Sequence, residues 1–222
     1  MIFRSSISFN SIAAAIGCFV GLAPGLAAAP AYATDLTVVH QSALEFVCMF
    51  DGNCRSSIGP AGVGAITPPE PSSDPRLLAS NFSAKPGSPG DGTTVYLYRV
   101  DLTSADKASE CLSGVVLNFG PLAEIPPVNG NTAHVFVIGS GDSAGTVPVK
   151  SAEQDGDFIQ FNFDGGLCPG ASSLMFALPS KHPPGPSGAT IFGYGHPPVT
   201  TAKTIAPKHS LEAPSNLRVE PE

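Results

Sequence analysis

The residues best suited to covalent chemistry lie at 141–145, where the chain reads Gly-Asp-Ser-Ala-Gly. This fits the pattern G-x-S-x-G, in which a turn between a strand and a helix presents a serine hydroxyl as a nucleophile. Carboxylates and then histidines follow, in the order of a Ser-Asp-His triad. The carboxylates are Asp155, Asp157 and Asp164, and the histidines are His182 and His196. One hypothesis is therefore a small serine hydrolase that uses Ser143 with Asp155 and His182.

The chain around this motif favours the strand before the serine but not the helix after it. Residues 133–139 (AHVFVIG) are apolar and partly β-branched, as is typical of a strand. Residues 146–150 (TVPVK) are also rich in β-branched side chains, and Pro148 would fall in the first turns of the required helix. The competing hypothesis is that 139–146 is a polar turn between two strands, in which Ser143 has no catalytic role.

The pentapeptide at 141–145 resembles the GDSAG box of hormone-sensitive-lipase-type esterases and differs by one residue from the GDSGG of trypsin-like proteases. The resemblance implies that Ser143 is the nucleophile of an acyl-transfer enzyme. Two features depart from these families. The HGGG segment that supplies oxyanion donors in the esterases is missing from the sequence, and trypsin-like enzymes place their serine after the histidine and the aspartate.

Acidic residues near the motif offer a second kind of site. Glu153, Asp155 and Asp157 alternate along the segment EQDGD, and calcium is bound by carboxylate and carbonyl oxygens on loops. Their spacing is not that of an EF-hand, and Asp-Gly is also a common hairpin turn, so a calcium ion and a solvated turn are both possible. The chain lacks tryptophan, so a glycan partner would have to stack on Tyr96, Tyr98 or Tyr194.

The first 33 residues have the pattern of a cleaved export signal. Arg4 precedes an apolar run at 12–22, and Ala31-Tyr32-Ala33 matches the small-x-small rule of signal peptidase. The run is too short for an ordinary transmembrane helix, and no run of membrane length follows it. We therefore expect a secreted or periplasmic protein, with lipid attachment at Cys18 as the alternative. The net charge of −7 argues against nucleic acid as a partner.

Four cysteines remain after the predicted cleavage, namely Cys48, Cys54, Cys111 and Cys168. An even number in an exported chain predicts two disulfides, and four cysteines allow three pairings. Cys48 and Cys54 bracket the turn-rich stretch MFDGN, which predicts a small ring, so we expect Cys111 to pair with Cys168. A metal site is the weaker interpretation because the chain has no C-x-x-C pair.

Short apolar runs separated by Gly and Pro predict an all-β fold. The chain contains 24 Gly and 23 Pro, and the clearest alternation is at 157–165, where Ile159, Phe161 and Phe163 alternate with polar residues. Further strands are expected at 93–102, 113–122, 133–139, 173–179 and 189–195. These predict an antiparallel β-sandwich, Ig-like or jelly-roll-like, over 36–200.

Other stretches have weaker patterns. Residues 36–50 fit a strand pair or an amphipathic helix equally well, and 104–112 could form one or two helical turns. Residues 56–75 are rich in Gly, Pro and Ser and predict a long surface loop. Residues 201–222 mix charge and proline, which predicts a flexible C-terminal tail.

Between about residues 74 and 195 the layout resembles a loose class of bacterial exported β-sandwich domains that often carry C-terminal surface-sorting tags. The similarity rests on the aromatic strand TVYLYRVDL, the strand SGVVLNFGPL, and the pair of strands in FIQFNFDGGLCPGASSLMFALPS. The Pro-Glu-Pro and transmembrane tail of that class is absent from this sequence. The resemblance implies an exported protein with a β-sandwich fold and no particular activity. Beside the serine hydrolase, the second hypothesis is a non-catalytic exported module that binds a glycan or a cell-envelope partner, or that has a structural role in the envelope or matrix.

Overall fold

The computed structural model describes residues 33–54, 76–105, 110–128, 131–139, 145–193 and 198–208. Several predictions fall outside these ranges. They concern residues 1–32 of the export signal, Cys18 within it, the loop at 56–75, and Ser143.

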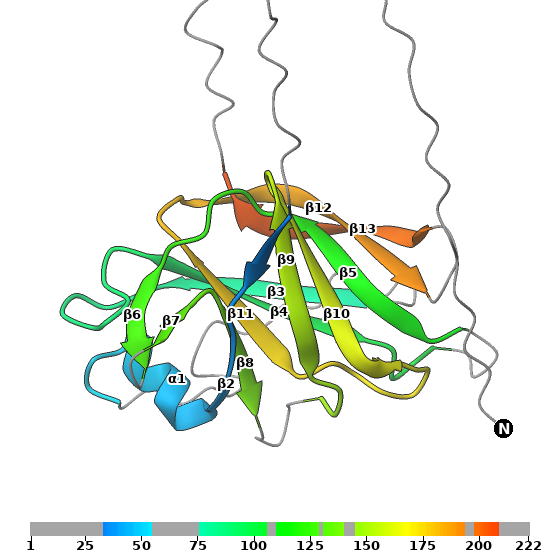
Figure 1. Ribbon diagram of the computed structural model, residues 1–222, viewed down its shortest axis with the longest axis horizontal. Coiled ribbons are helices and arrows are strands. Elements are labelled where there is room, and N and C mark those ends of the chain that lie inside the picture. The colour runs from blue at the N-terminus through cyan, green and yellow to red at the C-terminus, as the bar shows by residue number, and fades with distance from the viewer. Residues whose placement is uncertain are drawn as a thin grey trace, which may run out of the picture. The chain divides into compact units, whose positions relative to one another are not determined.

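Within the described residues the strands form two stacked sheets and one small hairpin (Figure 1). The six-stranded sheet has the order β1 (Thr34–Leu36), β9 (Val149–Asp155), β10 (Phe158–Leu167), β5 (Leu112–Asn118), β12 (Pro184–Gly193) and β13 (Pro198–Pro207). The five-stranded sheet has the order β2 (Val38–Ser42), β8 (Val135–Gly139), β11 (Met175–Ser180), β4 (Thr94–Asp101) and β3 (Arg76–Ser83). The hairpin pairs β6 (Ile125–Val128) with β7 (Asn131–Ala133). The prediction of an all-β sandwich is confirmed.

One strand pair departs from the expected antiparallel arrangement. β2 runs parallel to β8, whereas the other pairs in the two sheets are antiparallel. β1 and β2 belong to one extended segment, which passes from the six-stranded to the five-stranded sheet at Thr37. The carbonyl of Thr37 accepts hydrogen bonds from the backbone N–H groups of His134 and Val135, both at 3.1 Å, and these bonds hold the crossing point.

The main core lies between the two sheets and contains the side chains that the alternation predicted. Ile159, Phe161 and Phe163 of β10 are buried, while Gln160 on the same strand is exposed. From the five-stranded sheet, Tyr96, Tyr98 and Phe176 extend into the same core. The rings of Phe161 and Phe176 meet across the sheets with their centroids 4.7 Å apart. Burial of large apolar side chains from both inner faces is the main force that holds the layers together.

A short helix covers the outer face of the five-stranded sheet and makes a second core. The ambiguous segment 36–50 forms both β2 and the helix α1 (Ala43–Phe50). Phe46 and Phe50 of α1 pack edge-on against Phe82 and Phe136 of the sheet. Both faces of this sheet are therefore buried, which explains why β4 is buried along almost its whole length.

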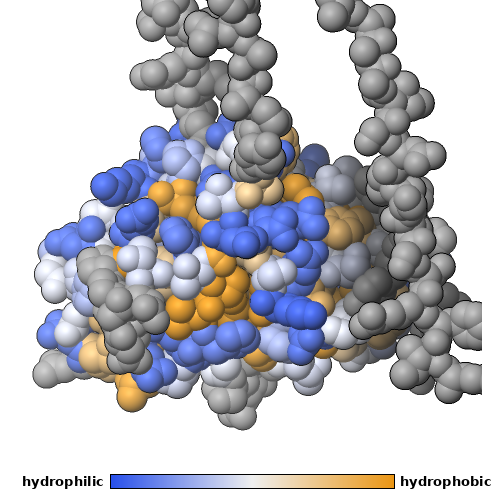
Figure 2. All heavy atoms as spheres, in the orientation of Figure 1, coloured by the Kyte–Doolittle hydropathy of each residue, from blue (hydrophilic) through white to orange (hydrophobic). Residues whose placement is uncertain are grey.

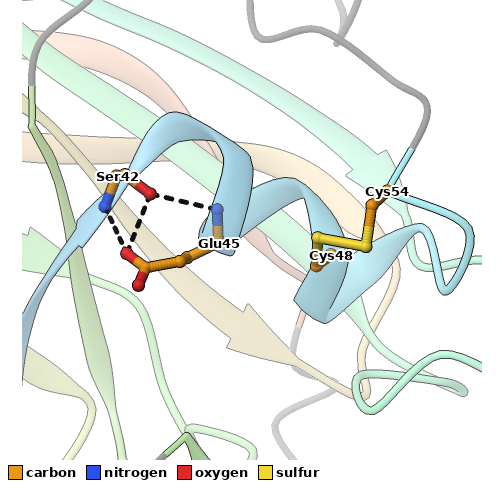
Figure 3. The surroundings of a disulfide bond; sticks show 4 residues. All are labelled: Ser42, Glu45, Cys48 and Cys54. Atoms are coloured by element: carbon orange, nitrogen blue, oxygen red, sulfur yellow. Dashed lines mark hydrogen bonds between the residues drawn. A yellow bond between two sulfur atoms is a disulfide. The ribbon is translucent and has the colours of Figure 1, made fainter.

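The start of α1 is set by a capping box (Figure 3). The Ser42 hydroxyl accepts a hydrogen bond from the backbone N–H of Glu45 at 3.2 Å, and the Glu45 carboxylate accepts one from the backbone N–H of Ser42 at 2.8 Å. These bonds satisfy two N–H groups that have no partner inside the helix, so the chain changes from strand to helix at this residue. The backbone and side-chain hydrogen bonds from Ser42 lower the pKa of the Glu45 carboxyl.

Two disulfides close the fold in the predicted pairing. Cys48 on α1 bonds to Cys54 just beyond the helix (Figure 3), and Cys111 bonds to Cys168. The second bond joins the start of β5 to the end of β10, next to the strand pair formed by Leu112 and Leu167. Because disulfides persist in oxidising surroundings, the two bonds indicate that the protein functions in an oxidising compartment.

The predicted start of the tail at residue 201 is wrong, because β13 continues the six-stranded sheet to Pro207. Thr204 and Ala206 are buried against the core, and Lys203, just before them, is exposed. These inward side chains are small, so the strand lacks the large apolar residues on which the prediction relied. At 104–112 the predicted helical turns are not seen in the described residues, where Ser104 lies in a turn and Leu112 begins β5.

Among the residues that the structure describes, no helix is both long and apolar enough to cross a membrane.

Candidate functional site

The chain that follows the G-x-S-x-G motif leads into β-structure within a few residues. Val147 makes a bridge to Ser173, β9 begins at Val149, and residues 145–155 contain no helix. A nucleophile elbow requires a helix at this position, because the helix N-terminus helps to bind the oxyanion. The strand predicted after the motif is thus confirmed, whereas Ser143 itself lies outside the described residues.

The last glycine of the motif has a structural role. A Cβ atom at Gly145 would overlap the backbone carbonyl oxygens of Ser172 and Ser173. The next residue, Thr146, donates its backbone N–H to the Ser172 carbonyl at 2.8 Å. Only glycine allows the two backbones to approach this closely. The packing of the sandwich therefore accounts for glycine at the end of the motif.

The other residues of the predicted triad and calcium site lie in two separate places, the hairpin of β9 and β10 and the connection between β11 and β12. Glu153 and Asp155 belong to β9, and Asp157 lies in the two-residue turn that leads to β10. His182 follows β11 and precedes β12, and its side chain is exposed. Among the described residues, no three His, Cys, Asp or Glu side chains gather closely enough to hold a metal ion.

The turn between β9 and β10 holds the segment that connects β5 to β6, which we call the strap (residues 119–124). The backbone carbonyl of Asp157 accepts hydrogen bonds from the N–H groups of Phe119 and Gly120, both at 2.8 Å. The Gln154 side chain donates to the Gly120 carbonyl at 2.9 Å. The acidic turn therefore positions the strap through its backbone, and its carboxylates take no part in these contacts.

The far end of the strap is held by the five-stranded sheet. The backbone N–H of Ala123 donates to the Pro179 carbonyl at 2.9 Å. The Ser180 hydroxyl, which is buried, donates to the Pro121 carbonyl at 3.1 Å. The strap is thus held by hydrogen bonds to strands and turns of both sheets.

Two open hollows flank the strap and share Pro121, Leu122 and Glu124. The first hollow, of about 500 Å³, is completed by Ala123, Lys181 and His182. The second, of about 410 Å³, is completed by Thr34, Leu36, His134, Gln154 and Gly156. Figure 2, drawn in the orientation of Figure 1, shows an apolar strip in the region between β1 and β6 with hydrophilic residues on both sides.

The two hollows combine an apolar floor with a few polar groups, as binding sites commonly do. Leu36 and Leu122 pack against the main core and give the floor its apolar character. The exposed Glu124 carboxylate lies between the hollows, with His182 on one side and His134 on the other. Glu124 and His134 were not predicted, because no motif surrounds them and only the fold brings them together.

The tyrosines proposed for glycan stacking are not on the surface. Tyr96 and Tyr98 are both 0 % exposed, and Tyr194 lies outside the described residues. The Tyr96 hydroxyl donates to the backbone carbonyl of His182 at 2.8 Å, and the Tyr98 hydroxyl donates to that of Ile205 at 2.6 Å. The prediction that Tyr96 and Tyr98 stack on a glycan is therefore wrong, because β4 directs both rings into the core.

Burial raises the pKa of the Tyr96 phenol to about 12 from its usual 10.0. Between pH 10 and 12 the unfolded chain loses the phenolic proton while the folded protein keeps it. The free energy of unfolding should therefore fall as pH rises through this range. The free energy of unfolding of Tyr96→Phe should fall less steeply over this range. At pH 8 it should be about 1 kcal/mol lower than that of the wild type, because the hydrogen bond of the hydroxyl group is lost. Urea unfolding of both proteins at pH 8, 10 and 11 measures the difference, and equal slopes would contradict the prediction.

Comparison with family models and with curated proteins finds no match to this chain.

Proposed function

We propose that the chain is an exported β-sandwich module, secreted or periplasmic, that binds a cell-envelope or matrix component and performs no catalysis. The observation that carries the proposal is the pair of hollows beside a strap held by both sheets. A preformed concave surface with an apolar floor requires little reorganisation when a ligand binds. The disulfides support an extracytoplasmic setting.

The alternative function, a serine hydrolase that uses Ser143, is less well supported. The motif leads into β9 instead of a helix, and packing accounts for Gly145.

A fluorophosphonate probe separates the two functions, since it labels activated serines. We expect no labelling of the folded protein, and labelling that disappears in Ser143→Ala would overturn the non-catalytic proposal. Mass spectrometry of the labelled peptide identifies the serine.

The binding role is tested by co-sedimentation with purified cell-envelope fragments. Glu124→Lys reverses the charge shared by both hollows, and we expect it to reduce the bound fraction at least about fivefold. Asp164→Lys makes the same change at an exposed position on β10 and should bind as the wild type does. The hollows are not the site if both variants bind equally, and the proposed role fails if the wild-type protein does not sediment.

A further inference from the structure

The outer surface of the six-stranded sheet carries a flat aromatic side chain whose position depends on a glycine. Phe192 of β12 is the cross-strand partner of Gly114 on β5. A Cβ atom at Gly114 would overlap the backbone carbonyl oxygen of Phe161 and would lie only 2.9 Å from Cζ of Phe192, so the tip of the ring lies against this glycine. Phe192 is half-buried, which leaves part of the ring open to solvent.

A ladder of neutral polar side chains lies beside this ring. Asn162 of β10 is the other cross-strand partner of Gly114 and pairs on its far side with Ser151 of β9. The Asn162 amide donates to the Ser151 hydroxyl at 3.2 Å, and the Gln160 amide donates to the Asn162 oxygen at 3.1 Å. These bonds fix the orientation of both amides.

The ladder retains unused hydrogen-bonding capacity. Each side-chain amide has two N–H donors and an oxygen that can accept two bonds. The two bonds within the ladder use only part of that capacity, and Gln160 is exposed. The surface therefore presents donors and acceptors at fixed positions next to an apolar plane.

We propose that this surface, formed by Phe192, Asn162, Gln160 and Ser151, binds a neutral glycan. A sugar ring has an apolar C–H face that can stack on an aromatic ring and a rim of hydroxyl groups that both donate and accept hydrogen bonds. All four side chains are uncharged, and Glu153, the cross-strand partner of Gln160 on β9, adds a negative charge at the edge of this surface. The chain as a whole carries a net charge of −7, which disfavours an anionic polysaccharide.

This inference is independent of the hollows beside the strap, because none of its residues lines them. It also differs from the earlier expectation of tyrosine stacking, since the aromatic group is Phe192. Polar residues on the outer face of β10 are an ordinary feature of a sandwich. The distinctive feature of this surface is that the Phe192 ring lies against Gly114, in line with the ordered amide of Asn162.

Isothermal titration calorimetry with cellohexaose, xylohexaose and mannohexaose tests the proposal on the full chain. We expect at least one of these neutral hexasaccharides to bind. Phe192→Ala should weaken that binding at least about tenfold, and Asn162→Ala about fivefold, as expected for loss of a stacking group and of one hydrogen bond. Phe192→Tyr should retain binding, because it keeps the ring.

Phe158→Ala is the matched control, since Phe158 lies on the same strand as Asn162 and is 53 % exposed. It should bind as the wild type does.

The proposal is overturned if none of the three sugars binds, if Phe158→Ala loses as much affinity as Phe192→Ala, or if hexagalacturonate binds more tightly than every neutral sugar. Glu124→Lys should leave sugar binding unchanged, so failure here and failure at the hollows are distinguishable. An unchanged urea midpoint for Asn162→Ala excludes loss of folding as the cause of its weaker binding.

Discussion

Replacing both Cys111 and Cys168 with alanine should lower the free energy of unfolding by about 4 kcal/mol. The bond closes a sequence separation of 57 residues, and a longer closed loop removes more conformational freedom from the unfolded chain. It also lies beside Leu112 and Leu167, which are 1 % and 0 % exposed, so the link stands at the edge of the main core. Urea unfolding under non-reducing conditions at neutral pH measures the loss.

The second disulfide provides the control. Cys48 and Cys54 are separated by only six residues, and the same chain-entropy relation predicts a loss of about 2 kcal/mol when both become alanine. The long-range bond should therefore matter about twice as much as the short one. A larger loss from the Cys48 and Cys54 variant would show that the ring at the end of α1, and not the link between β5 and β10, is the more important constraint.

Gly145→Ala should lower the free energy of unfolding by about 3 kcal/mol. The added methyl group would overlap the carbonyl oxygens of Ser172 and Ser173, which are backbone atoms and cannot rotate away. Relief would require the bridge between Val147 and Ser173 to separate, together with the hydrogen bond from Leu174 to the Val147 carbonyl at 2.7 Å. Thermal and urea unfolding both report this loss.

Gly188→Ala serves as the matched control for Gly145→Ala. Gly188 lies on β12, where an added Cβ would meet no atom within 4 Å, so we expect a change of at most about 0.5 kcal/mol. If the two alanine variants were equally stable, the close approach at Gly145 would not explain the glycine. The structural interpretation of the motif would then lose its main support.

Strands with large inward side chains were predictable, and strands with small ones were not. β10 alternates Ile159, Phe161 and Phe163 with polar residues, and that pattern alone identifies a half-buried strand. The buried residues of β13 include Thr204 and Ala206, whose small side chains carry too little apolar area to stand out. Burial of these residues depends on neighbouring strands, which the local sequence does not specify.

The sequence also failed to predict β3, because this strand is buried on both faces of its sheet. β3 contains Leu77 and Leu78 in succession, and both are buried because one faces the main core while the other faces the outer side of the sheet. Such a strand lacks alternation and cannot be separated by periodicity from other short apolar runs. The segment 36–50 was ambiguous for a related reason, since it contains a strand and a helix divided by the capping residue Ser42.

The sequence by itself determined the fold class, the spacing of the main strands and the pairing of the cysteines. Each of these follows from local chemistry, because alternating apolar residues, turn-forming residues and a short cysteine-bounded loop act over a few residues. Only the tertiary structure decided that Gly145 must be glycine, that Phe192 lies against Gly114, and that His134 and His182 flank the strap that carries Glu124. These arrangements join residues from different strands and connections, and contacts between distant segments leave no periodic signal in the chain.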